Sequence, residues 1–348
     1  MANFCINGTF LSEKRTGIYR FAEEIIKALD CQINENNLIL VVPRKTIIPF
    51  HLKKIKVVEF GIKKGILWEQ TFFALYLFLH RAKAINLCNV TPLIAPRGLS
   101  VIHDINYKVN PQYFSHFYGK LSRKWHCIQY WIISHFAQHI FTVSEFSKSE
   151  IMRVYGVDEK KITVTPNGWQ HMLSIKPSLQ ESIKKFGLRS QCYYLSLSTI
   201  APNKNLKWVL NAAKNNPNEI FAIAGSLNPA RFGIELDIKG IQNVKFLGYI
   251  SDEDFVTLAK NCKAFIFPSF YEGFGLPPLE VMSLGTPVIV SDRCSLPEIF
   301  GNSAQYINPN NPNINIDLLL QQTVSSNQLV LSNFSWSKSA AKIIQWVE

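Results

Sequence analysis

Short apolar runs alternate with amphipathic stretches along most of the chain. The runs are rich in β-branched and aromatic residues, as buried strands are, whereas the amphipathic stretches repeat their apolar positions every three or four residues, as helices do. Strands that alternate with helices predict parallel sheets joined by crossover helices. The predicted strands are 38–42, 100–102, 140–143, 161–164, 193–197, 220–224, 244–247, 264–267 and 287–290.

Two predicted helices bear on the organisation of the chain. One begins directly after Thr16-Gly17, and an apolar stripe runs along it: Ile18, Phe21, Ala22, Ile25, Ile26 and Leu29. The other covers residues 334–347 and carries Trp336, Ala340, Ile343 and Ile344 on one side. Because this side needs an apolar surface to cover, we expect the last helix to pack back toward the N-terminal domain.

The length of 348 residues predicts two domains, since single cores stop growing at about 250–300 residues. A hydrophobic content of 47% with 18% charged residues excludes a disordered or fibrous chain. The turn cluster TPNG at 165–168 precedes a weakly periodic stretch and a new strand near Tyr193. We therefore predict an N-terminal domain over 1–170, a C-terminal domain over 171–333 and a separate C-terminal helix over 334–348.

The charge is distributed unevenly. Residues 1–170 contain 22 Lys and Arg against 12 Asp and Glu, a balance of +10, and residues 171–348 contain 15 against 13, a balance of +2. A nucleic acid, an anionic membrane surface or an anionic acceptor such as a lipid diphosphate would each explain the basic half. A solvated basic face is an equal alternative.

The cysteines and the start of the chain favour a cytoplasmic protein. Seven cysteines are scattered without a C-x-x-C pair, as reduced core thiols are, and the N-terminus does not resemble a signal peptide. The most apolar stretch, residues 65–80, is interrupted by Glu69 and Gln70 and is shorter than the ~20 residues of a spanning helix. Any membrane contact is expected to be peripheral, at the inner face of the cell membrane.

Residues 117–141 mix basic and aromatic side chains on one predicted helix. Lys120, Arg123 and Lys124 lie near Trp125 and Trp131, a combination that can dock on an anionic membrane. A core helix with an exposed basic first turn is the alternative for the same pattern.

The segment with the clearest chemistry is FIFPSFYEGFGLPPLEVMSLGTPVIVS, residues 265–291, which predicts a strand, a glycine-bearing loop, a short helix and a strand. Gly273 and Gly275 allow close backbone approach, and a helix starting near Pro277 or Pro278 would direct free N–H groups at the loop. Glu272 stands before the loop and Glu280 falls in the first helical turn, so two carboxylates could bind two sets of hydroxyls. A tight turn and a helix-dipole interaction are the simpler explanations.

This segment resembles the E-x7-E signature of the family 4 (group 1) glycosyltransferases, which have the GT-B fold: two Rossmann-like, doubly wound parallel-sheet domains with a cleft between them. The resemblance implies that Glu272 faces the donor sugar and that Glu280 binds the nucleotide ribose. It also implies that backbone groups of Phe274, Gly275 and Leu276 contact the sugar and the diphosphate.

The stretch YLSLSTIAPNKNL, residues 194–206, resembles the family's strand and loop ending in Lys-Asn, which would place Lys204 on the donor diphosphate. A fixed ammonium would stabilise the charge that develops on the leaving nucleoside diphosphate. Many relatives have Gly at the position of Ser198 and Arg at that of Thr199, which leaves Lys204 without its usual partner. Thr199 remains a predicted donor contact.

In the N-terminal half, KRTGIYRF places Gly17 at the strand-to-helix turn where the resemblance implies that an acceptor or a donor phosphate approaches. The stretch VIHDINY, residues 101–107, resembles the family's His-Asp segment, so His103 is the predicted contact of the donor sugar. Asp104 either shares that role or caps the next turn.

Two further segments resemble the family without evident chemistry. FTVSEFSKSEI at 141–151 predicts a helix capped by Ser144, and VTPNGW at 164–169 departs from the usual Asn-Gly-Val-Asp ending at Trp169.

No metal is expected. Asp252 and Asp254 form an Asp-x-Asp sequence, but Ser251 before them predicts a capped helix with an acidic first turn. The resemblance places backbone near Gly248, with Tyr249 and Ile250, close to the nucleobase.

We expect a retaining glycosyltransferase that moves a hexose or deoxyhexose from a nucleotide-sugar to a glycan or lipid-diphosphate-linked acceptor in bacterial surface polysaccharide assembly (O-antigen, capsule or lipopolysaccharide). No candidate nucleophile is evident, so a front-face reaction is the natural mechanism. A nucleotide-sugar epimerase or a sugar phosphorylase on the same scaffold is the alternative. A non-catalytic nucleic-acid-binding protein is disfavoured, because neither an aromatic RNA-binding motif nor a helix-turn-helix is present.

Overall fold

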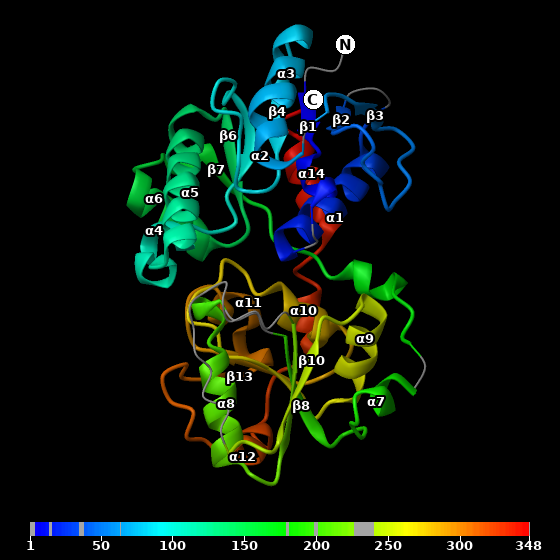
Figure 1. The fold of residues 1–348 in the computed structure, drawn as a ribbon, viewed down its shortest axis with the longest axis vertical. Helices are drawn as coiled ribbons and strands as arrows, with labels where there is room; N and C mark the ends of the chain where they lie inside the picture. Colours follow the sequence, from blue (N-terminus) through cyan, green and yellow to red (C-terminus); the bar gives the residue numbers. More distant parts are fainter. Residues whose placement is uncertain are drawn as a thin grey trace. The chain divides into compact units, whose positions relative to one another are not determined.

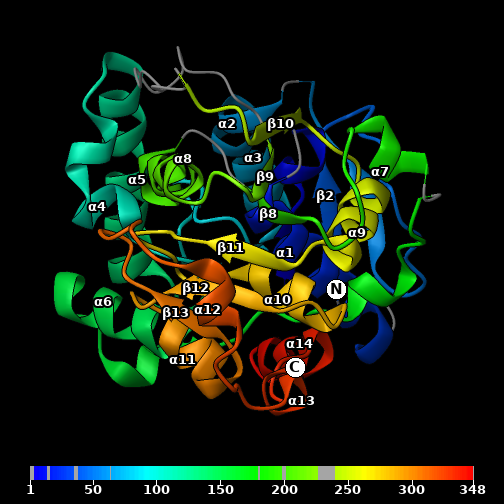
Figure 2. The same ribbon diagram turned by 90° about the horizontal axis from the view of Figure 1, so that it is seen from below.

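The computed structural model describes residues 4–13, 16–34, 38–62, 64–178, 181–197, 201–225 and 240–347. These residues form two compact units, each built on its own sheet (Figures 1 and 2). The N-terminal unit comprises Met1–Val109, Leu121–Gly168 and Ser335–Glu348, and the C-terminal unit comprises Asn110–Lys120 and Trp169–Phe334. The grouping of Asn110–Lys120 with the C-terminal unit differs from the predicted boundaries, because nothing in the hydrophobic pattern marks this segment.

Seven parallel strands form the sheet of the N-terminal unit, in the order β3-β2-β1-β4-β5-β6-β7. Strand β1 has β2 on one side and β4 on the other, so the chain reverses its winding direction between β1 and β4. Ligands of open α/β sheets bind at the carboxyl ends of strands at such a switch point. The strands are β1 (Phe4–Asn7), β2 (Leu38–Val42), β3 (Lys56–Glu59), β4 (Lys83–Asn86), β5 (Gly98–Val101), β6 (His139–Thr142) and β7 (Ile162–Val164).

Helices of the N-terminal unit follow the apolar stripes of the sequence. Helix α1 (Gly17–Gln32) is capped by Thr16, and its buried face includes Phe21, Ile25 and Leu29. The chain from α2 (Gly65–Trp68) to α3 (Ala74–His80) passes through a turn of π-helix, η2 (Glu69–Phe73). The other elements are η1 (Thr9–Ser12), α4 (Asn106–Val109), α5 (Phe117–Phe136), α6 (Glu145–Tyr155) and η4 (Glu159–Lys161).

The C-terminal helix α14 (Trp336–Ile344) lies against α1, as Figure 1 shows. The rings of Phe21 and Trp336 meet edge to face with centroids 5.9 Å apart. The Ser339 hydroxyl donates to the Pro166 carbonyl at 2.5 Å, and Lys342 Nζ donates to the Val164 carbonyl at 2.7 Å. The end of the chain therefore completes the core of the unit with which it begins.

Six parallel strands form the sheet of the C-terminal unit, in the order β10-β9-β8-β11-β12-β13. The winding reverses between β8 and β11, and a core around Trp208, Phe221 and Ile289 lies beside this sheet. The strands are β8 (Tyr193–Leu197), β9 (Ile220–Ala224), β10 (Val244–Gly248), β11 (Ala264–Phe267), β12 (Val288–Ser291) and β13 (Gln305–Ile307).

The helices and 3₁₀ turns of this unit are short. They are η3 (Pro111–Phe114), η5 (Gln170–Ser174), α7 (Glu181–Lys185), η6 (Pro202–Lys204), α8 (Leu206–Asn215), α9 (Asp252–Asn261), α10 (Leu276–Ser283), α11 (Leu296–Phe300), η8 (Gly301–Ser303), α12 (Ile316–Leu320) and α13 (Asn327–Leu331). The predicted architecture of two doubly wound parallel sheets is thereby confirmed. Across the described ranges, no helix has both the length and the apolar composition needed to cross a membrane.

Candidate functional site

The loops that follow β8 and β11 carry the two charged groups that the sequence singles out. Lys204 ends the 3₁₀ turn η6 after β8, and Glu272 lies in the loop after β11. Lys204 Nζ lies 2.8 Å from Glu272 Oε1 and 5.1 Å from the centre of the Phe267 ring. The ammonium and the carboxylate therefore meet at the switch point of the sheet, where a nucleotide is expected to bind.

The loop that carries Glu272 is fixed by hydrogen bonds from its neighbours. Phe270 N donates to Asn203 O at 2.8 Å, and Asn203 Nδ2 donates to Tyr271 O at 3.2 Å. The Ser295 hydroxyl donates to the Glu272 carbonyl at 3.0 Å. A loop held by both flanking segments presents its side chains in one geometry, as preorganised catalysis requires.

Gly275 is a residue that the loop geometry demands. Its φ of +97° is left-handed, and a Cβ at this position would lie 2.5 Å from Leu296 Cδ2. Helix α10 begins directly after it, at Leu276. Because Pro277 and Pro278 have no N–H, the backbone donors of this helix end are those of Gly275 and Leu276.

The sequence predicted Glu280 in the first helical turn, but it lies in the second. The reason is that α10 begins at Leu276, one residue before the first proline. Glu280 Oε1 lies 2.8 Å from His171 Nε2, and the Glu280 side chain is 11% exposed. His171 belongs to η5, and the sequence did not point to it because no motif surrounds it. The histidine orients the carboxylate that is expected to meet a ribose.

The other predicted donor contacts lie in the same unit. Phe274 is buried and packs edge to face on Phe334 with ring centroids 5.3 Å apart, and Leu276 is also buried. Tyr249 is exposed and Ile250 is buried, both directly after β10. Thr199, together with Ser198, lies outside the described residues.

In the N-terminal unit, the two predicted contacts occupy different environments. Gly17 is the first residue of α1, and a Cβ built on it would meet no atom within 4 Å, so the backbone faces open space. His103 follows β5 and is buried; its ring meets the Phe21 ring edge to face at 4.7 Å. The Asn89 side chain accepts from His103 N at 2.7 Å.

The protonation state of His103 follows from its surroundings. Burial lowers the pKa of the imidazole to about 4, so the ring is neutral at pH 7. Nε2 lies 2.9 Å from the Leu87 carbonyl, which can only accept, so Nε2 carries the proton. Nδ1 is then a hydrogen-bond acceptor.

Asp104, Ser144 and Trp169 have structural partners. Asp104 Oδ1 accepts a hydrogen bond from Asn106 N at 2.9 Å. This bond caps the turn, which was the second of the two roles considered for Asp104. Ser144 caps α6, and Ser147 of that helix donates to the His103 carbonyl at 2.9 Å. Trp169 Nε1 donates to the Leu331 carbonyl at 2.9 Å.

The acidic sequence at 252–254 forms the first turn of α9, with Ser251 as its N-cap, as predicted. Within the ranges that the structure describes, no group of three or more His, Cys, Asp and Glu side chains is placed to hold a metal.

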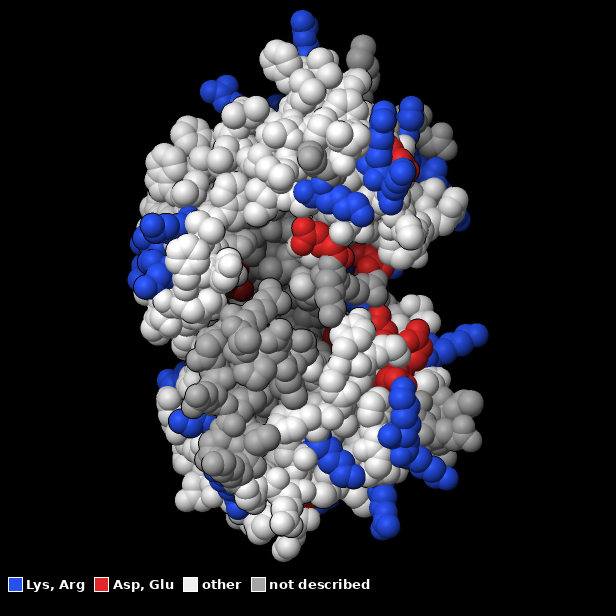
Figure 3. All heavy atoms as spheres, in the orientation of Figure 1, with Lys and Arg blue, Asp and Glu red and all other residues white. Residues whose placement is uncertain are grey.

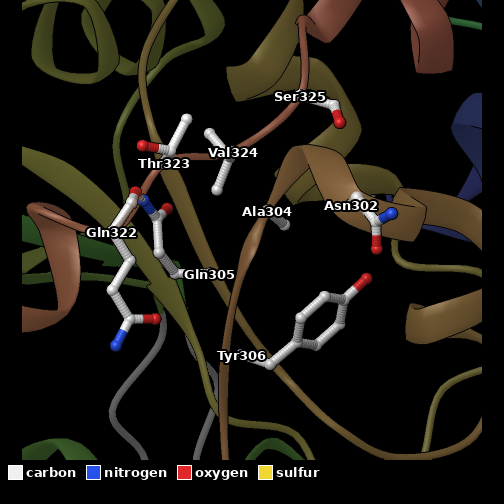
Figure 4. Close-up of a pocket in the computed structure, with 8 residues that line it drawn as sticks. All are labelled: Asn302, Ala304, Gln305, Tyr306, Gln322, Thr323, Val324 and Ser325. Atoms are coloured by element: carbon white, nitrogen blue, oxygen red, sulfur yellow. Dashed lines mark hydrogen bonds between the residues drawn. The ribbon is translucent and has the colours of Figure 1, made fainter.

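A cavity of about 490 Å³ lies at β13 (Figure 4). Neutral side chains line it, among them Gln305, Tyr306, Gln322 and Thr323. None of the predicted site residues lies in its wall.

Two family models match the chain. Residues 180–347 match the glycosyl transferases group 1, and residues 74–170 match glycosyltransferase family 4. O-antigen chain mannosyltransferase B of Escherichia coli is 34% identical over 184 residues, which cover 50% of this chain and 48% of that protein. The aligned part of the chain thus spans about half the length of this relative.

One relative aligns over most of the chain. The N,N'-diacetylbacillosaminyl-diphospho-undecaprenol alpha-1,3-N-acetylgalactosaminyltransferase of Campylobacter jejuni is 26% identical over 339 residues, covering 84% of this chain and 82% of that protein. Among solved structures, Anabaena HepE in complex with UDP and glucose has a TM-score of 0.70 at 17% identity, covering 100% of this chain and 99% of HepE. This likeness shows the same two-sheet fold.

Proposed function

Because the chain belongs to the group 1 glycosyltransferases, we propose that it transfers a hexose or deoxyhexose from a nucleotide-sugar, with retention of configuration, to a glycan or lipid-diphosphate-linked acceptor. The observation that carries the proposal is the contact of Lys204 with Glu272 at the switch point between β8 and β11. A cation for a diphosphate and a carboxylate for sugar hydroxyls meet there.

The roles in the donor site follow from this geometry and from the family resemblance. Lys204 stabilises the charge on the departing nucleoside diphosphate, and the N–H groups of Gly275 and Leu276 lie at the α10 end that favours an anion. Glu272 binds the sugar, and Glu280, oriented by His171, binds the ribose.

Retention follows from a front-face reaction. The bond between the sugar C1 and the diphosphate oxygen breaks, and the acceptor oxygen bonds to C1 on the same face. The acceptor hydroxyl gives its proton to the departing diphosphate, so no protein nucleophile is needed. In the N-terminal unit, Nδ1 of neutral His103 accepts a hydrogen bond from a sugar hydroxyl.

The relatives favour a particular pair of substrates. The name of the Escherichia coli relative specifies mannose transfer to an O-antigen chain, and that of the Campylobacter jejuni relative specifies a diphospho-undecaprenol acceptor. We therefore propose GDP-mannose as the first donor to test and bacterial surface polysaccharide assembly as the setting.

The basic N-terminal unit suits an acceptor at an anionic membrane. Figure 3 shows Lys and Arg side chains gathered over the region of β2 and β3. In the segment from β2 to β3, Arg44, Lys45, Lys53 and Lys56 are exposed. On α5, Lys120 and Lys124 are exposed beside Leu121. Exposed apolar and basic side chains on one helix are typical of peripheral docking at the inner face of a membrane.

The test is a donor screen with a matched pair of lysine variants. GDP-mannose, UDP-glucose and other nucleotide-sugars are incubated in EDTA with octyl α-mannoside or a lipid-diphosphate-linked sugar, and products are identified by mass spectrometry. Lys204→Met is expected to lower turnover about 100-fold or more, as loss of one electrostatic stabiliser does. Lys207→Met removes an exposed lysine in the next helix and is expected to change nothing.

Three outcomes would contradict the proposal. Wild-type turnover in Lys204→Met would remove the donor site from this position. Sugar release that requires inorganic phosphate would indicate a phosphorylase, and an epimerised nucleotide-sugar without transfer would indicate an epimerase.

A further inference from the structure

Glu69 occupies an unusual place in the N-terminal unit. It opens the π-helical turn η2 between α2 and α3 and is 2% exposed. Single turns of π-helix are rare and are often found at functional sites. Both carboxyl oxygens accept hydrogen bonds from amides: Oε2 from Asn7 Nδ2 at 2.9 Å and Oε1 from Gln70 Nε2 at 2.8 Å.

On one side, Glu69 is connected to the loop that leads to Gly17. Asn7 is the last residue of β1, and its Oδ1 accepts from both the backbone N–H and the hydroxyl of Thr9, at 3.2 and 2.7 Å. Thr9 begins η1, the helical turn that the structure describes between β1 and α1. The orientation of the Asn7 amide therefore sets the start of this loop.

On the other side, Glu69 is connected to the loop after β4. Gln70 Nε2 also donates to Thr91 O at 3.1 Å, and Gln70 Oε1 accepts from Leu93 N at 2.9 Å. Asn86, the last residue of β4, joins the same network through Asn7 and Thr91. This loop contains Leu87 and Asn89, which hold the ring and the backbone of His103.

Burial makes the ionisation of Glu69 relevant near neutral pH. Desolvation raises the pKa of the carboxyl group to about 7, and Glu13 adds to the increase, while the Asn7 and Gln70 hydrogen bonds oppose it. The other ionisable groups that interact with it electrostatically are Cys88, after β4, and Tyr19, on α1, and both have a raised pKa. Glu69 thus changes charge in a network that ends at two strands of the switch point.

We propose that Glu69 is a positioning residue of the transfer site: it holds the loops after β1 and β4, and with them Gly17 and His103, and it loosens both loops when it loses its proton. The inference rests on the proposed function only in assigning these loops to that site. The hydrogen bonds connect both loops to Glu69, and the burial of its carboxyl group gives the connection its dependence on pH.

The direction of the effect follows from proton linkage. A carboxyl group with a pKa near 7 when the loops are closed and near its ordinary 4.5 when they open favours opening as pH rises. From pH 6 to pH 8 the opening equilibrium is expected to increase about tenfold.

Hydrogen–deuterium exchange of the whole protein tests this without any substrate. Protection of peptides spanning 8–12 and 87–93, corrected for the intrinsic exchange rate, should fall about tenfold between pH 6 and pH 8 in the wild type. Glu69→Gln should abolish this change. Glu24→Gln serves as the matched control, because Glu24 is also buried, in α1, but pairs with Lys27 at 2.9 Å, and it should leave the change intact.

A second variant tests the connection itself. Thr9→Val removes the hydroxyl bond to Asn7, so residues 8–12 should lose protection at every pH while residues 87–93 keep their pH dependence. The proposal is overturned if wild-type protection of both loops is independent of pH, or if folded Glu69→Gln keeps the tenfold change. Because the experiment uses no donor, a failed transfer assay with intact pH dependence would refute the proposed function and leave the coupling of Glu69 to the two loops standing.

Discussion

Acidification should destabilise the protein through His103. The folded-state pKa of His103 is about 4, against 6.5 for an exposed histidine, because the buried ring loses the hydration of its charged form. A histidine with a lowered pKa contributes stability that is fully present above pH 6.5 and is lost as the pH falls toward 4.

The magnitude follows from the two pKa values. The complete shift of about 2.5 units corresponds to about 3 kcal/mol in the free energy of unfolding, and about 2 kcal/mol of it should be lost between pH 7 and pH 5. His103 is only 6% exposed, so screening by solvent reduces this figure little. Burial also lowers the pKa of His126 and His139 to about 4, so the total loss in the wild type should be larger.

The contribution of His103 is isolated by comparison with His103→Gln. Urea unfolding followed by tryptophan fluorescence at pH 7 and pH 5 should show a pH-dependent loss about 2 kcal/mol smaller in the variant. His135→Gln, at an exposed position on α5, should behave as the wild type does. An equal loss in His103→Gln and the wild type would show that the ring is already charged, or exposed, at pH 5.

Two further predictions concern other parts of the chain. Gly275→Ala should lower the free energy of unfolding by about 1–3 kcal/mol, because the φ of +97° and the nearby Leu296 exclude a Cβ. It should also weaken the binding of a nucleoside diphosphate; urea unfolding measures the first effect and calorimetry the second. Unchanged binding would argue against the start of α10 as an anion site. The protein should bind anionic vesicles but not neutral ones, and salt should weaken this binding. Joint neutralisation of Lys120, Arg123 and Lys124 should weaken it by about 1 kcal/mol per exposed charge. If the triple variant binds vesicles as the wild type does, the docking surface lies elsewhere.

The strands whose bounds were predicted correctly are continuous or nearly continuous apolar runs in the sequence. Strands 38–42, 193–197, 220–224 and 264–267 match β2, β8, β9 and β11 to the residue. Strands β1, β3, β4 and β13 were missed. Edge strand β3 is largely exposed, so its sequence KVVE lacks a buried run.

The candidate site was predictable where it depends on local sequence. Glu272, Gly275 and Lys204 stand in recognisable loops, and the structure brings Lys204 and Glu272 together. His171 and Glu69 were not predicted, because each acquires its partner from a segment far along the chain: 109 residues separate His171 from Glu280, and 62 separate Glu69 from Asn7. No periodic pattern encodes such a pairing.

Helix α14 has a consequence for biosynthesis. Most of the N-terminal unit is synthesised before the C-terminal unit, yet the helix that packs on Phe21 is synthesised only after the whole segment Trp169–Phe334. At roughly 5–20 residues per second, the apolar surface of α1 stays uncovered for about 10–30 s after the rest of its unit has been synthesised. A nascent chain that stalls before α14 is synthesised would thus have an incomplete core in its N-terminal unit, a form that chaperones and proteases recognise.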